Sequence, residues 1–299
     1  MSETGNGMGL YRSLRPLDWL FLLYTAYTGF LVAGGDIGDL GRICLLGAHG
    51  ILLLVPFLLH RYWSCSRSWG RFIHISYPLF FLIFFYRELD LVNRWICSFP
   101  HDEEIQALDR ALGTANLRDK LIDLSPSPWL EGFLNAGYFS YYFLLPAVGV
   151  PLALKRRWDA LEEFVFVSFL AYVVCYTFYT VYPVNGPFLE AHPEASFEHK
   201  DWMSRLTYTI VANWGSTGAA FPSSHVAAAL VIAVLARRLV PKAFWFLGPV
   251  SIWLTCATVY GGYHYAVDAL AGVLTAAIVL ALAPYVSRAL ERLSRCIVK

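Results

Sequence analysis

Long apolar stretches constrain the fold of this chain more than any other feature of its sequence. A helix that crosses the hydrocarbon core of a bilayer needs about 20 mostly apolar residues, and eight stretches come close to that length. They cover about residues 17–34, 43–59, 72–89, 129–153, 160–182, 222–240, 244–261 and 264–285. We therefore predict an all-α fold, a polytopic membrane helix bundle with about eight transmembrane helices.

The composition indicates that these helices face lipid. Hydrophobic residues make up 57% of the 299-residue chain and charged residues only 15%, whereas a soluble domain carries about 25% charged residues. The formal net charge of +1 gives no reason to expect a nucleic-acid partner. The six cysteines are scattered, without the spacing of a metal or redox site, and we interpret them as apolar packing residues.

Basic residues alternate with the apolar stretches. If the N-terminus is cytoplasmic, every cytoplasmic segment is basic, as the bias of Lys and Arg toward that side requires. The basic residues are Arg12, Arg15, Arg61, Arg67, Arg71, Lys155, Arg156, Arg157, Arg237, Arg238, Lys242, Arg288, Arg292, Arg295 and Lys299. We predict a multi-pass protein with cytoplasmic termini. A bacterial inner membrane and a Golgi-type membrane fit the same topology, and the compact loops favour the bacterial one. A cleaved signal peptide is the alternative for the first stretch.

Two longer segments lie on the side opposite the basic loops. Residues 90–128 mix charged and apolar residues and end in Ser-Pro-Ser-Pro, a pattern typical of one or two short interfacial helices followed by a turn. Residues 183–221 are rich in Pro, Gly, Asn and aromatic residues, and we expect an irregular loop that caps the bundle. No internal repeat divides the chain, so we predict a single integral membrane domain over residues 1–299.

The sequence Phe-Pro-Ser-Ser-His at 221–225 opens the sixth apolar stretch. Pro favours the first turn of a helix and Ser favours the N-cap, which predicts that His225 lies in an opening turn. Free backbone N–H groups and the helix dipole make such a turn suitable for binding an anion. The small residues at 215–218 either let the backbone approach a ligand closely or form a plain flexible turn.

His264 and Asp268 are four residues apart at the start of the last stretch, so on a helix they share one face. A carboxylate behind an imidazole fixes its tautomer and leaves the other ring nitrogen free to attack or to accept a proton. The predicted topology places His225 and His264 at the outer ends of their helices, so one site can hold all three side chains. Each residue taken alone is more typical of a structural role, and the combination is what indicates chemistry.

Two motifs carry a resemblance to a known family. Residues 222–225 and 264–268 resemble the second and third signature motifs of the type 2 phosphatidic acid phosphatase superfamily. The His-Tyr-x-x-Asp form of the latter, together with residues 182–187, resembles the inositol phosphorylceramide synthase-like branch of that superfamily. The resemblance covers about residues 72–285, which it implies are a six-span catalytic core, and leaves residues 1–71 as two additional N-terminal spans.

The resemblance also implies roles for the three residues. His264 would be the nucleophile that takes the phosphoryl group as a phosphohistidine, and Asp268 would orient it. His225 would protonate the leaving oxygen and then activate the acceptor. No metal and no cofactor is implied, and a zinc site built from the same three side chains is the alternative on ligand chemistry alone.

One departure from the family pattern bears on the substrate. The phosphatase branch has basic residues in its first motif and an Arg six residues before the nucleophilic His, where this chain has Thr258. A phosphomonoester dianion favours bidentate Arg or Lys donors, whereas a phosphodiester carries a single charge. The sequence therefore favours transfer of a phospho-head group over release of phosphate. The basic residues that would weaken this interpretation by reaching the site are Arg87, Arg94, Lys200 and Arg205.

Polar residues near the predicted site are candidates for binding substrate, because hydroxyl, amide and guanidinium groups donate to phosphate oxygens. The candidates are Ser223, Ser224, Asn185, Tyr182 and Arg87. For Arg87 the alternative is an internal ion pair with a neighbouring carboxylate. Tyr172, Tyr176 and Tyr179 share one helical face, and we interpret them as packing residues; the alternative is that hydroxyls near the outer end of this face touch substrate.

The predicted function is a metal-independent membrane enzyme that transfers a phospho-head group between phospholipids or sphingolipids through a phosphohistidine. Its partners would be a phospholipid donor and a lipid alcohol acceptor, and its site would face the periplasm or lumen. The first alternative is a lipid phosphate phosphatase, acting on phosphatidic acid or a polyprenyl phosphate with the same three residues. A remoter alternative is a transporter with a His/Asp proton relay, although such sites tend to lie near the bilayer midplane.

Overall fold

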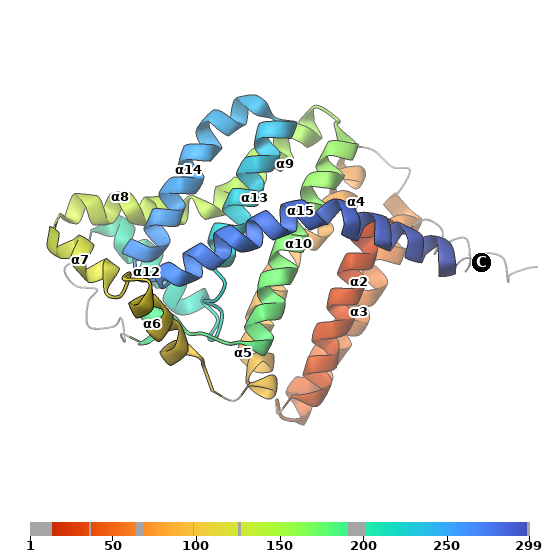
Figure 1. Ribbon diagram of the computed structural model, residues 1–299. Helices are drawn as coiled ribbons and strands as arrows, with labels where there is room; N and C mark the ends of the chain where they lie inside the picture. Colours follow the sequence, from red (N-terminus) through yellow and green to blue (C-terminus); the bar gives the residue numbers. More distant parts are fainter. Residues whose placement is uncertain are drawn as a thin grey trace, which may run out of the picture.

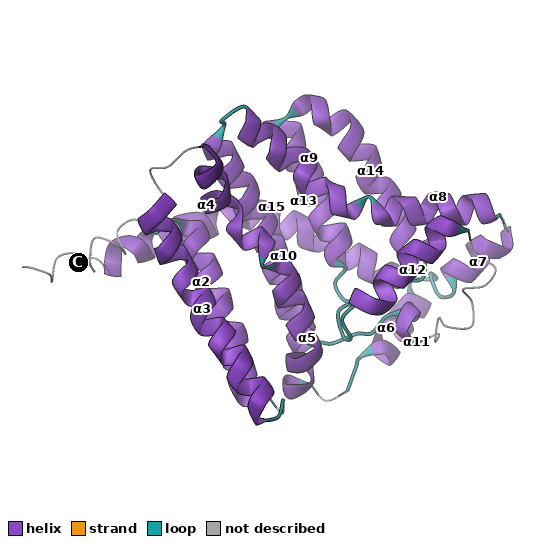
Figure 2. Cartoon of the chain, turned by 180° about the vertical axis from the view of Figure 1, so that it is seen from behind, coloured by secondary structure: helices purple, strands orange, loops and turns teal. Residues whose placement is uncertain are grey.

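A computed structural model describes residues 14–35, 37–63, 68–97, 99–124, 127–190 and 201–297. Within these ranges the regular structure is helical, apart from one isolated bridge between Val184 and Ala219 (Figure 2). The predicted all-α fold is confirmed. Helices stand at each of the eight predicted positions, and two of the eight are interrupted.

Helices α2 (Pro16–Gly34) and α3 (Asp39–Trp63) form a hairpin along one side of the bundle (Figure 1). The inner face of α2 packs against the core through buried Leu17, Phe21 and Tyr24. By contrast, Ile43 and Ile51 of α3 are 68% and 67% exposed. Large apolar side chains that are exposed along a helix are stable in lipid rather than in water.

The third predicted span is a pair of helices, α4 (Ser68–Phe80) and α5 (Leu82–Ile96). Pro78 explains the interruption at Phe81, because it lacks the N–H that would bond the carbonyl of His74. That carbonyl instead accepts a hydrogen bond from Arg15 Nη2 at 2.7 Å. The break therefore ties the start of α2 to α4.

The two short helices expected within residues 90–128 are confirmed as α6 (Asp102–Ala111) and α7 (Leu117–Leu124). They lie at the end of the bundle where α14 passes into α15 (Figure 1). In α6 the buried residues are Asp102, Ile105 and Asp109. Two carboxylates on the buried face of a short helix need partners, and they find them in the loops described below.

The fourth predicted span is also interrupted. It consists of α8 (Pro128–Phe139) and α9 (Tyr141–Leu154), which are bent by 42°. Ser140 stands at the bend, and its Oγ donates to the carbonyl of Gly137 at 2.6 Å. The bend brings the end of α8 against the core, which places Tyr138 at the site described below.

Helix α10 (Trp158–Val181) passes through the centre of the bundle and is buried along most of its length. It packs against α4, α5, α13 and α15. Tyr172 and Tyr176 are buried, and Tyr172 accepts a hydrogen bond from the Tyr141 hydroxyl at 2.8 Å. The interpretation of these two tyrosines as packing residues is confirmed.

The expectation of an irregular loop over residues 183–221 is wrong in part. The segment contains α11 (Pro187–Glu190) and the 13-residue helix α12 (Trp202–Trp214). Asp201 Oδ1 caps α12 by accepting the N–H groups of Met203 and Ser204 at 2.8 and 3.1 Å. The capped helix packs on α8, so tertiary contacts stabilise a helix that the local composition did not indicate.

The last three helices are α13 (Ser224–Leu239), α14 (Pro241–Tyr260) and α15 (Ala266–Ile297). Alanines on α13 allow its neighbours α10, α14 and α15 to pack closely around it. The turn from α14 into α15 lies near the N-terminal end of α13. The sequence motifs that open α13 and α15 thereby meet at one end of the bundle.

Five helices are long and apolar enough to cross a membrane, namely α2, α3, α10, α14 and α15, and the bent α8–α9 pair makes up to six. The other two predicted positions hold the interrupted α4–α5 pair and α13, which has only 16 residues. These numbers of helices refer to the residues that the structure describes. They agree with a polytopic membrane bundle whose spans are less regular than the sequence alone indicated.

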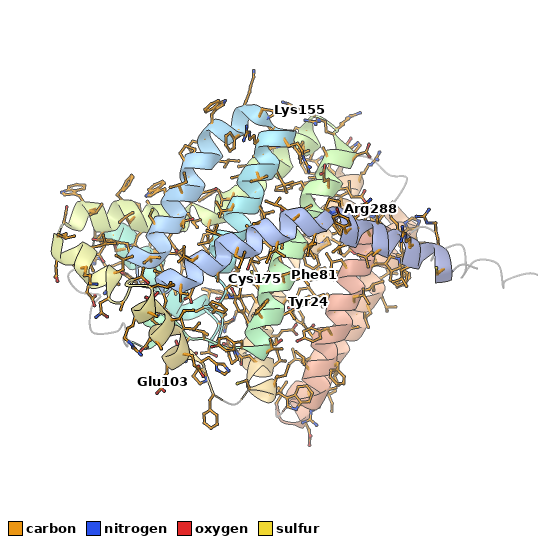
Figure 3. All side chains as sticks on the ribbon, in the orientation of Figure 1. Tyr24, Phe81, Glu103, Lys155, Cys175 and Arg288 are labelled. Atoms are coloured by element: carbon orange, nitrogen blue, oxygen red, sulfur yellow. The ribbon has the colours of Figure 1, made fainter. Side chains whose placement is uncertain are left out.

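Two residues of opposite charge mark the two ends of the bundle. Lys155, in the turn between α9 and α10, and Glu103 on α6 lie at opposite ends of the molecule (Figure 3). The end that carries Glu103 is also the end where the motifs at the starts of α13 and α15 meet.

Candidate active site

His225 lies in the first turn of α13, where the sequence placed it. The helix begins at Ser224, and Ser223 is its N-cap, with Oγ accepting the N–H of Val226 at 3.3 Å. The N–H groups of this turn face the same end of the bundle as the ring of His225. The N–H groups of Ser224 and Val226 are already bonded, to Tyr179 and to Ser223 Oγ, so the helix dipole rather than free donors favours an anion at this end.

Tyr179 of α10 holds this turn through two hydrogen bonds. Its hydroxyl accepts the N–H of Ser224 at 3.1 Å and donates to the carbonyl of Pro222 at 2.9 Å. The side chain is fully buried. The sequence indicated Tyr179 as a packing residue whose hydroxyl could touch substrate. Its bonds to Pro222 and Ser224 were not indicated, because contacts across 43 and 45 positions leave no local signal.

His264 is held by the turn between α14 and α15. The carbonyl of Thr258 accepts the N–H groups of both Tyr263 and His264, at 3.0 and 3.1 Å. Gly262 has φ +73°, a conformation that residues with a side chain rarely adopt. The hydroxyl of Thr258 donates to the carbonyl of Thr255 at 2.7 Å, so its proton is engaged within α14.

Asp268 stands in the first turn of α15, directly behind His264. Its Oδ2 lies 3.5 Å from Nδ1 of His264 and accepts the N–H of Tyr265 at 2.8 Å. The carboxylate is fully buried, and His264 is only 4% exposed. The backbone carbonyl of Asp268 accepts the N–H of Ser223 at 3.0 Å, which ties the two motifs together.

The two imidazoles meet face to edge. Nε2 of His264 lies 3.4 Å from Nδ1 of His225, and the ring centroids are 5.6 Å apart. The structure therefore brings the three predicted residues together, with the carboxylate at one nitrogen of His264 and His225 at the other. Chemically, a carboxylate near Nδ1 of His264 favours the tautomer in which Nε2 is free to attack, and the second ring can give or take a proton.

Aromatic side chains enclose His225. The Tyr138 hydroxyl lies 3.1 Å from Nε2 of His225, and the ring of Tyr141 is 4.3 Å from the imidazole, centroid to centroid. Tyr263 packs on the ring of Tyr138, with centroids 4.0 Å apart. Burial raises the pKa of the Tyr263 phenol well above its ordinary value, so this hydroxyl stays protonated. Sequence reasoning did not single out Tyr138 or Tyr263.

Asp102 of α6 holds the loop that follows α10. Its Oδ2 accepts the N–H of Asn185 and its Oδ1 accepts the N–H of Gly186, both at 2.9 Å. Gly186 has φ +81°, and a Cβ on it would stand 3.1 Å from the carbonyl oxygen of Tyr263. The loop is thereby pressed against the turn that carries His264.

Asp109 supports the start of α15 in the same way. Its Oδ1 accepts the N–H of Val267 at 3.0 Å and the hydroxyl of Thr114 at 2.9 Å. A carboxylate at a helix N-terminus is stabilising, because it satisfies a free N–H and complements the dipole. Both aspartates of α6 therefore bond backbone N–H groups next to the site, and the sequence did not indicate either of them.

The predicted substrate-binding residues fall around the site in different ways. Asn185 uses its Oδ1 to accept the N–H of Gly218 at 3.0 Å. Tyr182 stacks on His101 with ring centroids 4.0 Å apart. Ser223 and Ser224 are 0% and 4% exposed at the start of α13. Their contact with substrate remains a prediction.

Arg87 is engaged within the protein. Its Nη1 donates to the carbonyl of Gly215 at 2.8 Å and lies 3.3 Å from a carboxylate oxygen of Asp90. The internal ion pair considered for Arg87 is therefore present, and a role in binding a head group remains a prediction. Asp90 Oδ1 also accepts the N–H of Thr217 at 2.6 Å, which holds the glycine-containing turn before α13.

The sequence also indicated Arg94, Lys200 and Arg205 as basic residues that could reach the site. Arg205 is exposed on α12, while Lys200 and the side chain of Arg94 lie outside the part of the chain that the structure describes. Arg118 of α7, which the sequence did not indicate, packs on the turn that carries His264. Its Nε lies 3.0 Å from the position that a Cβ on Gly262 would take.

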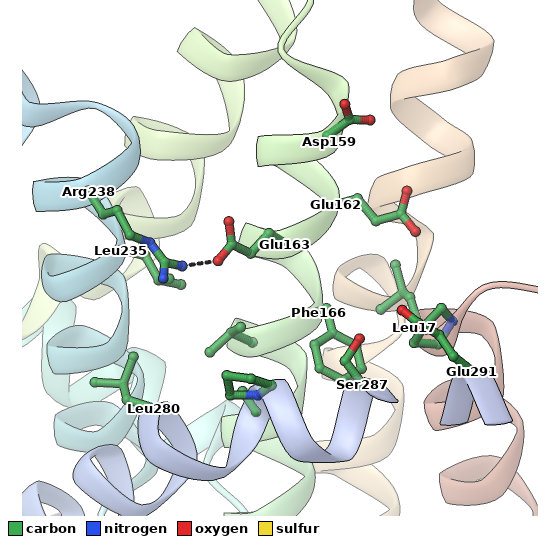
Figure 4. Close-up of a pocket in the computed structure, with 14 residues that line it drawn as sticks. Leu17, Asp159, Glu162, Glu163, Phe166, Leu235, Arg238, Leu280, Ser287 and Glu291 are labelled. Carbon is green, nitrogen blue, oxygen red and sulfur yellow. Dashed lines mark hydrogen bonds and ion pairs between the residues drawn. The ribbon is translucent and has the colours of Figure 1, made fainter. Parts of the chain in front are cut away.

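A separate cavity of about 420 Å³ lies between α2, α10, α13 and α15 (Figure 4). Asp159, Glu162, Glu163 and Glu291 are among the residues that line it, and Arg238 pairs with Glu163 on its wall. Asp159 lies at the start of α10, whereas Tyr179 at the far end of α10 touches the histidine site. The cavity therefore shares no residue with the His264 site.

The geometry of the site can be set beside known proteins. Comparisons with curated proteins and with solved structures give no significant match. A family model described as the PAP2 superfamily matches residues 103–282, which is more than half of the chain and includes His225, His264 and Asp268. The chain is therefore a member of the PAP2 superfamily.

Proposed function

We propose that this protein is an integral membrane phosphotransferase that moves a phospho-head group from a phospholipid to a lipid alcohol. The observation that carries the proposal is the 3.4 Å approach of His225 Nδ1 to His264 Nε2, with Asp268 at the other nitrogen of His264. Membership of the PAP2 superfamily supports phosphatase or phosphotransferase activity in general. The transferase reaction is the more specific step proposed here.

In the first step, Nε2 of His264 attacks the phosphorus of the donor lipid. The N–P bond forms as the P–O bond to the lipid alkoxide breaks, and His225 gives its Nδ1 proton to the leaving oxygen. Asp268 keeps a proton on Nδ1 of His264, so that the lone pair of Nε2 is free to attack. The product is an alcohol and a phosphohistidine that carries the head group.

In the second step, the acceptor alcohol occupies the place that the first alcohol left. Nδ1 of His225, now without its proton, takes the proton of the acceptor hydroxyl. The new O–P bond forms as the N–P bond breaks, and His264 and His225 return to their starting states. A distance of 3.4 Å between the two nitrogens leaves no place for phosphorus, so the rings must separate when a substrate enters.

The charge around the site supports a phosphodiester donor. The family's Arg position is Thr258, whose hydroxyl is engaged with Thr255, and Arg87 is engaged with Asp90 and Gly215. Arg118, packed on Gly262, is the described basic side chain that contacts the turn of His264, and its Nη1 also lies 3.3 Å from Oδ1 of the exposed Asp119. One guanidinium and the N-terminus of α13 suit the single charge of a diester better than the double charge of a monoester.

The branch of the superfamily, the acceptor and the membrane follow as parts of the same proposal. The His-Tyr-x-x-Asp form of the third motif supports an inositol phosphorylceramide synthase-like reaction with a sphingolipid acceptor. The basic residues of the turn at Lys155 lie at the end opposite Glu103. This distribution supports cytoplasmic termini and a site that faces the periplasm or lumen, in a bacterial inner membrane.

The second candidate is a lipid phosphate phosphatase, in which water takes the place of the acceptor alcohol. The same side chains serve both reactions, and superfamily membership favours this candidate equally. A transporter with a His/Asp relay is less well supported, because His225 and His264 lie at helix ends rather than midway along helices.

The test compares purified wild-type protein with His264→Ala in lipid nanodiscs. One arm supplies radiolabelled phosphatidic acid, and the other supplies head-group-labelled phosphatidylinositol with ceramide as the acceptor. We expect a new labelled lipid in the second arm and none with His264→Ala. His60→Ala is the matched control, because His60 lies on α3, away from the site, and it should behave as wild type.

Each other outcome has a definite meaning. Free phosphate from phosphatidic acid without lipid transfer would favour the phosphatase. Product formation by His264→Ala at the wild-type rate would overturn the catalytic assignment. Activity that survives exhaustive chelation with EDTA supports a metal-independent route, whereas loss that zinc alone restores would favour the zinc alternative.

A further inference from the structure

Tyr138 makes the same kind of contact with His225 that Asp268 makes with His264. Its hydroxyl lies 3.1 Å from Nε2 of His225, and the two rings lie 4.8 Å apart at an angle of 32°. Tyr138 comes from α8 and is 5% exposed. Neither sequence motif of the family contains it.

Tyr138 is held in place by its neighbours. Tyr263 packs on its ring at 4.0 Å, and the Tyr263 hydroxyl donates to Asn135 Oδ1 at 2.5 Å. Asn135 is one turn from Tyr138 on α8 and donates in turn to Ser204 Oγ at 2.9 Å. The hydroxyl of Tyr138 is thus positioned by two layers of packed and hydrogen-bonded groups rather than by a flexible side chain.

The contact between Tyr138 and His225 bears on which ring nitrogen of His225 exchanges a proton with the substrate. A neutral imidazole carries its proton on either nitrogen, and the partner of one nitrogen selects the tautomer. Nδ1 of His225 faces Nε2 of His264, so Nδ1 must give and take the proton. This requires that Nε2 keeps its proton throughout the reaction.

We propose that Tyr138 is a positioning residue whose hydroxyl oxygen accepts the Nε2–H of His225 and so makes Nδ1 the acid–base atom. The inference rests on the proposed phosphotransfer at His264. When the ring is doubly protonated, Tyr138 accepts from Nε2–H and Nδ1–H points to the leaving oxygen. After Nδ1 gives up its proton, the Nε2–H bond to Tyr138 remains and the lone pair of Nδ1 faces the acceptor.

The partners of the two histidines differ in charge, and this suits their different tasks. A carboxylate stabilises positive charge on the ring of the nucleophile, as a phosphohistidine requires. A neutral hydroxyl fixes the orientation of the acid without holding its proton as strongly as a carboxylate would. A site with a carboxylate at both rings would make His225 a more reluctant donor.

The test uses Tyr138→Phe, which keeps the ring packing and removes only the hydroxyl. Two donors are compared in the first turnover. One has a lipid alkoxide as leaving group, and the other is an alkyl p-nitrophenyl phosphodiester whose nitrophenolate leaves without a proton. The rate of each first step is followed over a range of pH.

We expect Tyr138→Phe to slow the first step about tenfold or more with the alkoxide donor and to change it little with the nitrophenyl donor. We also expect the alkaline limb of the alkoxide rate profile to move to lower pH, because the protonated ring has lost an acceptor. His225→Ala should show the same selectivity with a larger loss. Tyr142→Phe on the neighbouring α9, 48% exposed, is the matched control and should match wild type.

Equal losses with both donors and an unmoved pH profile would show that Tyr138 only packs, and would overturn the inference. Unchanged rates would do the same. Failure of the underlying function gives a different result, because His264→Ala would then retain activity with both donors. Circular dichroism of the purified variants excludes a folding defect as the cause of a loss.

Discussion

The carbonyl oxygen of Ser223 lies 2.7 Å from the point where a Cβ on Gly272 would stand. Val226 Cβ lies 2.9 Å from the same point. The start of α13 and the second turn of α15 therefore meet through bare backbone at Gly272. This contact, with the Ser223 N–H bond to the carbonyl of Asp268, sets the separation between the elements that carry His225 and His264.

Substitution at this contact should disturb the site. Gly272→Ala introduces a carbon where backbone stands, so α13 and α15 must move apart, and overpacking of this kind costs about 1–3 kcal/mol. We expect transferase activity to fall about tenfold or more, because small displacements of reacting groups are costly. Gly47→Ala on α3, where a Cβ would meet nothing within 4 Å, is the control, and equal activity of the two variants would contradict the account.

Asp268→Asn tests the tautomer of the nucleophile. The amide is isosteric with the carboxylate but does not stabilise the protonated Nδ1 of His264, so Nε2 loses its role as the free nitrogen. By analogy with carboxylates behind catalytic histidines, we expect kcat to fall about 10²–10⁴-fold with little change in helix content. Steady-state kinetics and circular dichroism measure the two quantities. A folded variant with nearly normal kcat would remove Asp268 from the mechanism.

Arg118→Gln tests whether this side chain binds the donor phosphate. A charge-assisted hydrogen bond contributes about 1.5–3 kcal/mol, which corresponds to a rise in KM for the donor of roughly tenfold to a hundredfold. Arg118→Lys should recover part of the loss. The control is Arg110→Gln on α6, where the basic side chain is exposed. A normal KM for the donor in Arg118→Gln would show that Arg118 does not bind the donor phosphate.

A buried pair outside the family match joins the N-terminal hairpin to the core. Nε2 of His49 lies 3.3 Å from Glu88 Oε2 and 3.0 Å from Thr28 Oγ1, and both members of the pair are 3% exposed. His49→Ala leaves a buried carboxylate without its partner, which costs about 3–5 kcal/mol. We expect a clearly lower unfolding temperature in detergent.

The double variant His49→Ala/Glu88→Leu is the informative comparison for this pair. Replacement of both members of a buried ion pair by apolar groups is often neutral, so the double variant should recover much of the lost stability. A double variant that is less stable than His49→Ala would show that the cost of His49→Ala does not come from an unpaired buried carboxylate at Glu88.

Much of the fold and the three central residues of the site could be predicted from sequence for local reasons. Apolar length predicts spans, and a Pro-Ser-Ser start predicts the helix turn that holds His225. The spacing of His264 and Asp268 predicts a shared helical face. Each of these signals lies within a few residues, where periodicity and capping rules apply.

What sequence reasoning missed depends on contacts between distant segments. Tyr138 reaches His225 across 87 positions, and Asp109 caps α15 across 158. No local pattern marks these residues, because their partners are chosen by helix packing. Helix α12 was missed for a similar reason, since its packing on α8 outweighs its composition.

The central claim is that His264 carries the phosphoryl group through Nε2, and a trapped intermediate tests it most directly. His225→Ala treated with the nitrophenyl phosphodiester needs no proton for the first step but lacks the base for the second, so the intermediate should accumulate. After a basic quench, mass spectrometry should locate acid-labile, base-stable phosphate on His264, bonded to Nε2. Release of nitrophenolate with no modification at His264, or the same modification yield in His225→Ala/His264→Ala, would contradict the account.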